Sequence, residues 1–147
     1  IIPEECPELL LQKERARDVI KEGPPPLSQV ELDIRRYTIS ARMDDLEGVT
    51  DQGIVNATLA LLHQDLGDFY LRARGRWSGL GRSLIRCLRS EDEGFASAFE
   101  SAFATGFAGG DMADLAVLVD KVLAPHGGRL QEGYRSAAPD DWKTFEG

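Results

Sequence analysis

Apolar side chains recur at helical spacing along most of this 147-residue chain, and clusters of glycine and proline separate the periodic pieces. This spacing places apolar side chains on one face of an α-helix, whereas a strand alternates them. The separating clusters lie at 23–26, 48, 75–81, 106–110 and 125–128. The pattern predicts an all-α fold, most simply an antiparallel helical bundle of five to six helices joined by short loops.

Signals at the helix ends define the first two predicted helices. A first helix is predicted over 7–22, because Pro7 suits the first turn of a helix and Gly23 suits the position after its end. Ser28 and Glu31 have the spacing of a capping box, in which each side chain binds a free backbone amide of the other residue. A second helix therefore begins there and is predicted to end at about residue 47.

The remaining helices differ in how widely their apolar residues are spread. A third helix, from about 51 to 74, has apolar residues on neighbouring faces, which is typical of the central helix of a bundle. A fourth is predicted to start after Ser78 or Gly79 and to be amphipathic. A fifth carries a stripe of aromatic side chains, formed by Phe95, Phe99 and Phe103, that is predicted to pack in the core. A sixth runs from a capping Asp111 to Pro125.

The composition indicates one globular domain. With 42% hydrophobic and 29% charged residues, the chain is predicted to form a single helical domain over 1–147, with a core at 28–125 and a mostly irregular tail at 126–147. No apolar run approaches the ~20 residues that a membrane span needs. Cys6 and Cys87 lack metal or redox spacing, which fits a reducing, cytoplasmic setting. With only two histidines in the chain, we expect no metal site.

Positive charge is concentrated in one stretch, which we call the arginine island (72–89). It contains six arginines and no carboxylate, whereas 1–71 carries 14 acidic and 7 basic residues and 90–147 carries 11 and 4. The net charge of −8 disfavours nucleic acid as a partner, so contact with an anion would be local to the island.

The glycine-rich part of the island suggests an anion site. Its glycines precede a predicted helix start, where free backbone amides and the helix dipole attract negative charge. The hypothesis is a phosphate or carboxylate ligand, with Arg76 and Arg82 as bidentate donors and Trp77 as a stacking surface. The alternative is that the arginines pair with acidic neighbours, namely Asp65, Asp68, Glu91, Asp92 and Glu93.

Two further polar features are candidates for chemistry. Asp44 and Asp45 form a carboxylate pair that can act as a general base or bind metal if repulsion raises one pKa, and the simpler interpretation is a solvated pair. His63 lies on the broad third helix without a serine, cysteine or second histidine at motif spacing. A partly buried histidine with a structural role is the simpler interpretation there.

Several of these residues together resemble a known family. The residues are Arg76-Trp77 with Gly79, Gly81 and Arg82, the helix end at 122–125, and the run Gly-Gly-Arg-Leu-Gln-Glu-Gly-Tyr-Arg at 127–135. Over about 24–136 the chain resembles the helical C-terminal portion of bacterial nucleotidyltransferase-domain proteins. In that family an N-terminal α/β domain holds magnesium and a nucleoside triphosphate through a Gly-Ser turn and an Asp-x-Asp pair, while the helical part closes the cleft and selects the acceptor.

The resemblance implies a binding role rather than catalysis by this chain alone. The sequence has neither a Gly-Ser dipeptide nor an Asp-x-Asp pair, and its start at Ile1 suggests that the catalytic N-terminal domain is missing. Magnesium and a nucleoside triphosphate are then expected for the full-length protein, with no cofactor bound by this chain alone. The residues that the resemblance places at the cleft are Arg76, Trp77, Arg82, Arg129, Glu132 and Tyr134.

Other functions stay open at this point. The alternative is a free-standing helical interaction module, such as an antitoxin-like partner, that binds another protein chain or forms a homodimer. An RNA-cleaving helical toxin is disfavoured, since neither His63 nor His126 follows an arginine by four to six residues.

Overall fold

The computed structural model describes residues 7–130, and their side chains from residue 10 onward. All regular structure in this part of the chain is helical, as the periodicity predicted. The α-helices are α1 (Pro7–Glu22), α2 (Gln29–Leu46), α3 (Gln52–Ala73), α4 (Arg82–Glu91), α5 (Glu93–Phe107) and α6 (Ala113–Leu123), followed by a short 3-10 helix, η1 (Ala124–His126). No described helix has the length and apolar character that crossing a bilayer requires.

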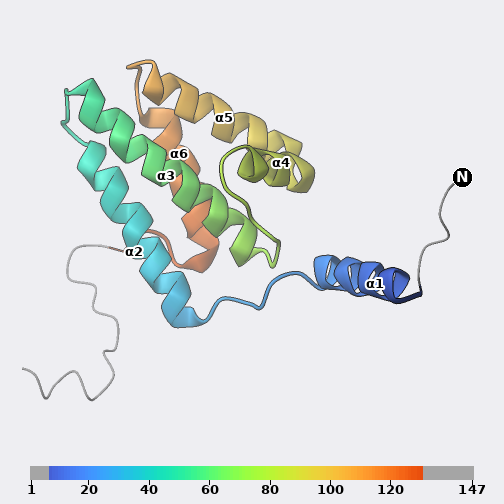
Figure 1. Ribbon diagram of the computed structural model, residues 1–147. Coiled ribbons are helices and arrows are strands. Elements are labelled where there is room, and N and C mark those ends of the chain that lie inside the picture. The colour runs from blue at the N-terminus through green and yellow to red at the C-terminus, as the bar shows by residue number, and fades with distance from the viewer. Residues whose placement is uncertain (1–6, 131–147) are drawn as a thin grey trace, which may run out of the picture.

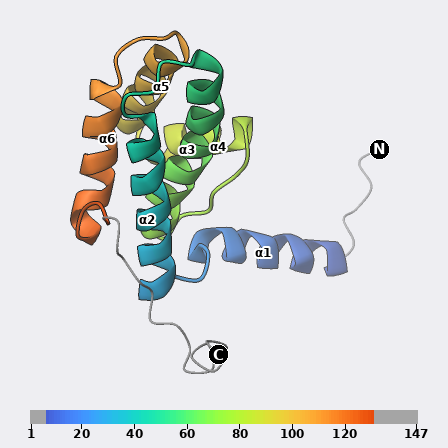
Figure 2. The same cartoon turned by 90° about the vertical axis from the view of Figure 1, so that its left-hand side faces the viewer.

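Helix α3 is the centre of the bundle. It packs against α2, α4, α5 and α6, and the views in Figures 1 and 2 show these helices around it. The broad apolar surface predicted for this helix is therefore buried against several neighbouring helices. Four of its side chains have no exposed surface: Leu59, Leu62, Leu66 and Phe69.

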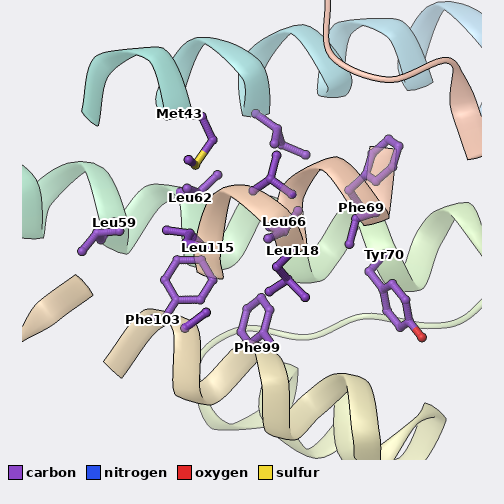
Figure 3. Packing of buried hydrophobic residues seen from close by; sticks show 14 of the residues in the cluster. Met43, Leu59, Leu62, Leu66, Phe69, Tyr70, Phe99, Phe103, Leu115 and Leu118 are labelled. Atoms are coloured by element: carbon purple, nitrogen blue, oxygen red, sulfur yellow. The ribbon is translucent and has the colours of Figure 1, made fainter. Parts of the chain in front are cut away.

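The core is formed where α3 meets the facing helices (Figure 3). Met43 comes from α2, Phe99 and Phe103 from α5, and Leu115 and Leu118 from α6. The phenylalanine stripe on α5 is therefore core, as its spacing predicted.

Helix α4 approaches α3 closely at a glycine. A Cβ at Gly67 would lie 2.9 Å from the nearest methyl carbon of Leu84, so a larger residue would require the Leu84 side chain or the helix to shift. Leu84 itself is fully buried. The apolar face of α4 therefore enters the core, and its arginine face is left outside.

Local capping fixes the helix ends. The Ser28–Glu31 capping box is present, with Ser28 N donating to Glu31 Oε2 at 2.8 Å and Glu31 N donating to Ser28 Oγ at 3.2 Å. The Asp92 carboxylate accepts from Phe95 N at 3.0 Å and so begins α5 directly after α4. These bonds satisfy amides that a helix start leaves without partners.

Ion pairs join α2 to α3 along their length. Arg35 pairs with Asp68, and Arg42 Nε lies 2.6 Å from Asp65 Oδ2. Both aspartates had been considered as partners of the arginine island, and the structure instead assigns them to α2.

Helix α1 has the predicted bounds but projects away from the bundle (Figures 1 and 2). From residue 10 onward its apolar side chains remain exposed, with exposed fractions of 53% for Val19 and 68% for Ile20. The described bundle therefore consists of α2–α6, with α1 as a separate arm.

Adjacent leucines on α3 provide a test of this packing. Leu62→Ala removes a fully buried side chain and is expected to lower the free energy of unfolding by about 3 kcal/mol. Leu61→Ala, at a position that is 53% exposed, is the matched control and is expected to change it by less than about 0.5 kcal/mol. Urea denaturation measures both; similar losses would contradict the assigned orientation of α3.

Candidate functional site

The segment between α3 and α4 is fixed by one carboxylate. Glu91, at the end of α4, accepts from Arg74 Nε at 3.2 Å and pairs with Arg76 Nε at 3.0 Å. Its side chain is only 16% exposed, whereas those of Arg74 and Arg76 are 50% and 60% exposed. Arg76 is therefore paired with an acidic neighbour, as one of the two interpretations of the arginine island predicted.

Trp77 connects this segment to α1. Its indole Nε1 donates to the carbonyl oxygen of Val19 at 3.2 Å, while 42% of the residue stays exposed. Gly23 lies so close to the same segment that a Cβ there would be 2.4 Å from the Gly75 carbonyl oxygen. Arg72 Nη2 also donates to the Pro25 carbonyl at 3.2 Å. The C-terminal end of α1 is therefore anchored to the island.

The start of α4 offers few free backbone donors. Ser83 N donates to Leu80 O at 3.1 Å, and Leu84 N donates to Gly81 O at 3.1 Å. The helix begins at Arg82, later than predicted, because the backbone at Gly81 has a positive φ of 56°. Most first-turn amides already have partners, so an anion near Arg82 would depend on side chains.

The arginines of the island differ in their partners. Arg89 pairs with Glu100 on α5, a carboxylate outside the predicted set. Arg82 and Arg86 are exposed and have no ion-pair partner among residues 10–130. These two side chains are the available cations of α4.

A shallow groove lies beside Trp77. Its volume is about 360 Å³, and it is lined by Leu71, Arg76, Trp77, Arg86, Cys87, Ser90 and Glu91. We refer to this groove together with Val19 and Ile20 of α1 as the arm surface. It combines exposed apolar area with an unpaired arginine.

Arg129 lies elsewhere in the fold. Its Nε is 2.6 Å from Asp120 Oδ1 on α6, and its Nη1 is 4.0 Å from Asp44 Oδ1 on α2. Arg76 instead pairs with α4, and no interaction joins these two arginines in the described part of the chain. The other two residues that the resemblance places at the cleft, Glu132 and Tyr134, lie outside the described residues.

Asp44 and Asp45 are exposed carboxylates near the end of α2. Only Asp44 approaches a cation, at the 4.0 Å separation from Arg129. Among the described residues, no three acidic, cysteine or histidine side chains are grouped closely enough to hold a metal ion.

His63 is packed between two phenylalanines of α5. Its ring centroid lies 4.8 Å from that of Phe99 and 4.9 Å from that of Phe103. Burial lowers the pKa of His63, and the Glu100 carboxylate opposes that shift in part. This environment gives His63 a packing role against the core residues Phe99 and Phe103.

A buried arginine fixes the start of the C-terminal segment, and the sequence did not reveal it. Arg36 Nε and Nη2 donate to the carbonyl of Gly128 at 3.0 and 2.9 Å, and Arg36 Nη1 pairs with Asp33 at 2.9 Å. Ser40 Oγ accepts from Leu130 N at 3.1 Å. The only signal in the sequence was an arginine at helical spacing among core residues of α2.

Comparison with known proteins found no match in any of three searches, against protein-family models, curated proteins and solved structures. The resemblance to nucleotidyltransferase-domain proteins therefore stays a prediction.

The Arg36 contacts predict a stability effect. Arg36→Met keeps the aliphatic stem but removes the hydrogen bonds to Gly128, so we expect the free energy of unfolding to fall by about 2 kcal/mol. Arg86→Met, at an exposed arginine without an ion-pair partner in the described chain, is the control and should change it by less than about 0.5 kcal/mol. Urea denaturation compares them, and equal effects would contradict a role for Arg36 in holding the segment.

The environment of His63 predicts a pH effect. Because its pKa is lowered on folding, the unfolded chain binds the proton more readily, and stability should fall as pH drops below the ordinary value of 6.5. An NMR titration should place the imidazole pKa below that value. His63→Gln should reduce the pH dependence of the urea midpoint between about pH 7 and pH 5. An imidazole that titrates above 6.5 would contradict this account.

Proposed function

We propose that this helical bundle is the accessory, substrate-positioning domain of a nucleotidyltransferase and that it contacts the catalytic domain through the arm surface. The observation that carries the proposal is the anchored but otherwise unpacked helix α1 (Figure 2). The resemblance of the island and of 127–135 to such proteins supplies the enzyme class.

Apolar residues of α1 are exposed in the described chain. A helix of 16 residues in water gains most of its stability from burying an apolar face against a neighbour. Here Val19 and Ile20 are exposed although the helix end is fixed by Trp77 and Gly23. A helix held in this position presents its apolar residues to another domain.

Two arginines of α4 suit the handling of phosphate. Arg82 and Arg86 have no ion-pair partner in the described chain, and Arg86 lines the same groove as Trp77, which is 42% exposed. Arginine donates in a planar fork that matches phosphate oxygens, and indole rings stack on bases. In the proposed complex, magnesium and the nucleoside triphosphate are held by the catalytic domain, and this chain contributes charge at the edge of the cleft.

The coding sequence upstream of residue 1 is the first test. A strand ending in Gly-Ser and followed by Asp-x-Asp supports the proposal. An unrelated domain or a stop codon contradicts it and favours the alternative, a free-standing helical module that uses the same surface to bind another protein.

The second test uses two positions of equal exposure. Ile20 on α1 and Val117 on α6 are both 68% exposed. In the full-length protein, Ile20→Asp should lower nucleotide transfer at least about tenfold, because a carboxylate would be buried in the domain contact. Val117→Asp should leave transfer unchanged. Incorporation of labelled nucleotide measures both, and equal activities would contradict docking through α1.

A further inference from the structure

A cavity of about 500 Å³ lies between α3, α5 and α6, and it includes neither α1 nor Trp77. Its size is within the range that small-molecule sites occupy. The pattern of residues along the chain does not predict this cavity, because its walls come from segments far apart in the chain. The cavity lies apart from the groove beside Trp77, and its ligand is argued without reference to the function proposed for the arm surface.

The walls of the cavity are aromatic and aliphatic. Tyr70 and Phe95 stack with ring centroids 3.7 Å apart and an interplanar angle of 4°, and both line the cavity. Phe69 lies on another side, with the His126 ring edge-on to it at 5.2 Å. Leu118 and Val122 of α6 complete the apolar lining. Such walls suit a flat or branched apolar body.

The polar groups of the lining are mainly cationic. Arg74 lies over the Tyr70 ring, with its Cζ 4.8 Å from the ring centroid. Its Nε is held by Glu91, and its two terminal nitrogens have no hydrogen-bond partner in the described chain. Lys121 on α6 is exposed and likewise has no ion-pair partner among residues 10–130. Two cations from different helices thus border the same apolar space.

The acidic groups nearby limit how much negative charge a ligand can carry. Asp92 lines the cavity while it caps α5, and Glu91 remains bound to Arg74. A polyphosphate would place several negative charges near these two carboxylates, which is unfavourable. A single negative charge can instead be shared by Arg74 and Lys121. The Tyr70 hydroxyl adds no negative charge, because a tyrosine is already protonated at neutral pH and burial raises the pKa of Tyr70 further.

We propose that this cavity binds a small organic carboxylate with an apolar body. The carboxylate lies between Arg74 and Lys121, and the body contacts Tyr70, Phe95 and Leu118. Neither the arm surface nor a catalytic domain is needed for this binding.

Naphthalene derivatives with different charges test the proposal on the full 147-residue chain. Isothermal titration calorimetry compares naphthoate, which carries one negative charge, with neutral naphthamide and with naphthyl phosphate. We expect naphthoate to bind at least about tenfold more tightly than naphthamide, since charge-assisted hydrogen bonds separate them. Naphthyl phosphate and adenosine triphosphate are expected to bind more weakly than naphthoate. Tighter binding of either phosphate would overturn the assignment to a carboxylate.

Variants then locate the site. Lys121→Gln and Arg74→Gln should each weaken naphthoate about tenfold while leaving naphthamide unchanged. Arg86→Gln is the matched control, because it removes a cation that does not line the cavity. Ala98→Trp, which adds a large ring at an exposed position on the lining, should weaken both compounds. Circular dichroism confirms folding of each variant, and Lys121 is exposed, so its loss leaves the core intact.

The controls separate binding in the cavity from binding elsewhere on the protein. Equal binding of naphthoate and naphthamide, or equal effects of Lys121→Gln and Arg86→Gln, would overturn the proposal. Ile20→Asp removes apolar surface from α1 and should leave naphthoate binding unchanged. Loss of binding in that variant would place the ligand on the arm surface and would also overturn it. Failure of the nucleotide-transfer tests leaves these binding results unaffected.

Discussion

Burial of α3 on several sides is the constraint on which the rest of the structure depends. Each leucine that the helix removes from water contributes roughly 1.5–3 kcal/mol, and four large side chains of α3 have no exposed surface. The helices α2, α4, α5 and α6 all pack on α3. The position of each of them in the bundle therefore depends on the direction of α3. The residues after its last turn carry Trp77, and its last buried turns supply Phe69 and Tyr70. Both surfaces considered for binding are therefore positioned by one helix.

The sequence predicted those features that depend on interactions within a few residues. Ser28 and Glu31 cap each other across three positions, and Pro7 and Gly23 limit α1 without reference to other helices. The phenylalanine stripe of α5 was also correct, because residues four apart lie on one face of a helix whatever that face contacts. Local geometry alone gives these results.

Apart from the late start of α4 at Gly81, the features that the sequence did not predict depend on contacts between distant segments. Arg36 and Gly128 meet across 92 positions, and Trp77 and Val19 across 58. Counting charges identified the arginine island, but it did not show that Glu91 binds two arginines while Asp65 and Asp68 are used by α2. The cavity required three helices to be placed before its lining could be named. Tertiary geometry decides which of several possible partners a charged side chain reaches.

Glu91 links the two surfaces. One oxygen of its carboxylate binds Arg74, which borders the cavity, and the other binds Arg76, which borders the groove beside Trp77. The two arginines of these ion pairs are largely exposed, and exposed ion pairs add little to the free energy of unfolding. Their main effect is to hold two long side chains in place. A less ordered Arg74 would lose more conformational entropy on binding a ligand. The same carboxylate thus orders one arginine at each surface, Arg74 at the cavity and Arg76 at the groove, from a single position at the end of α4.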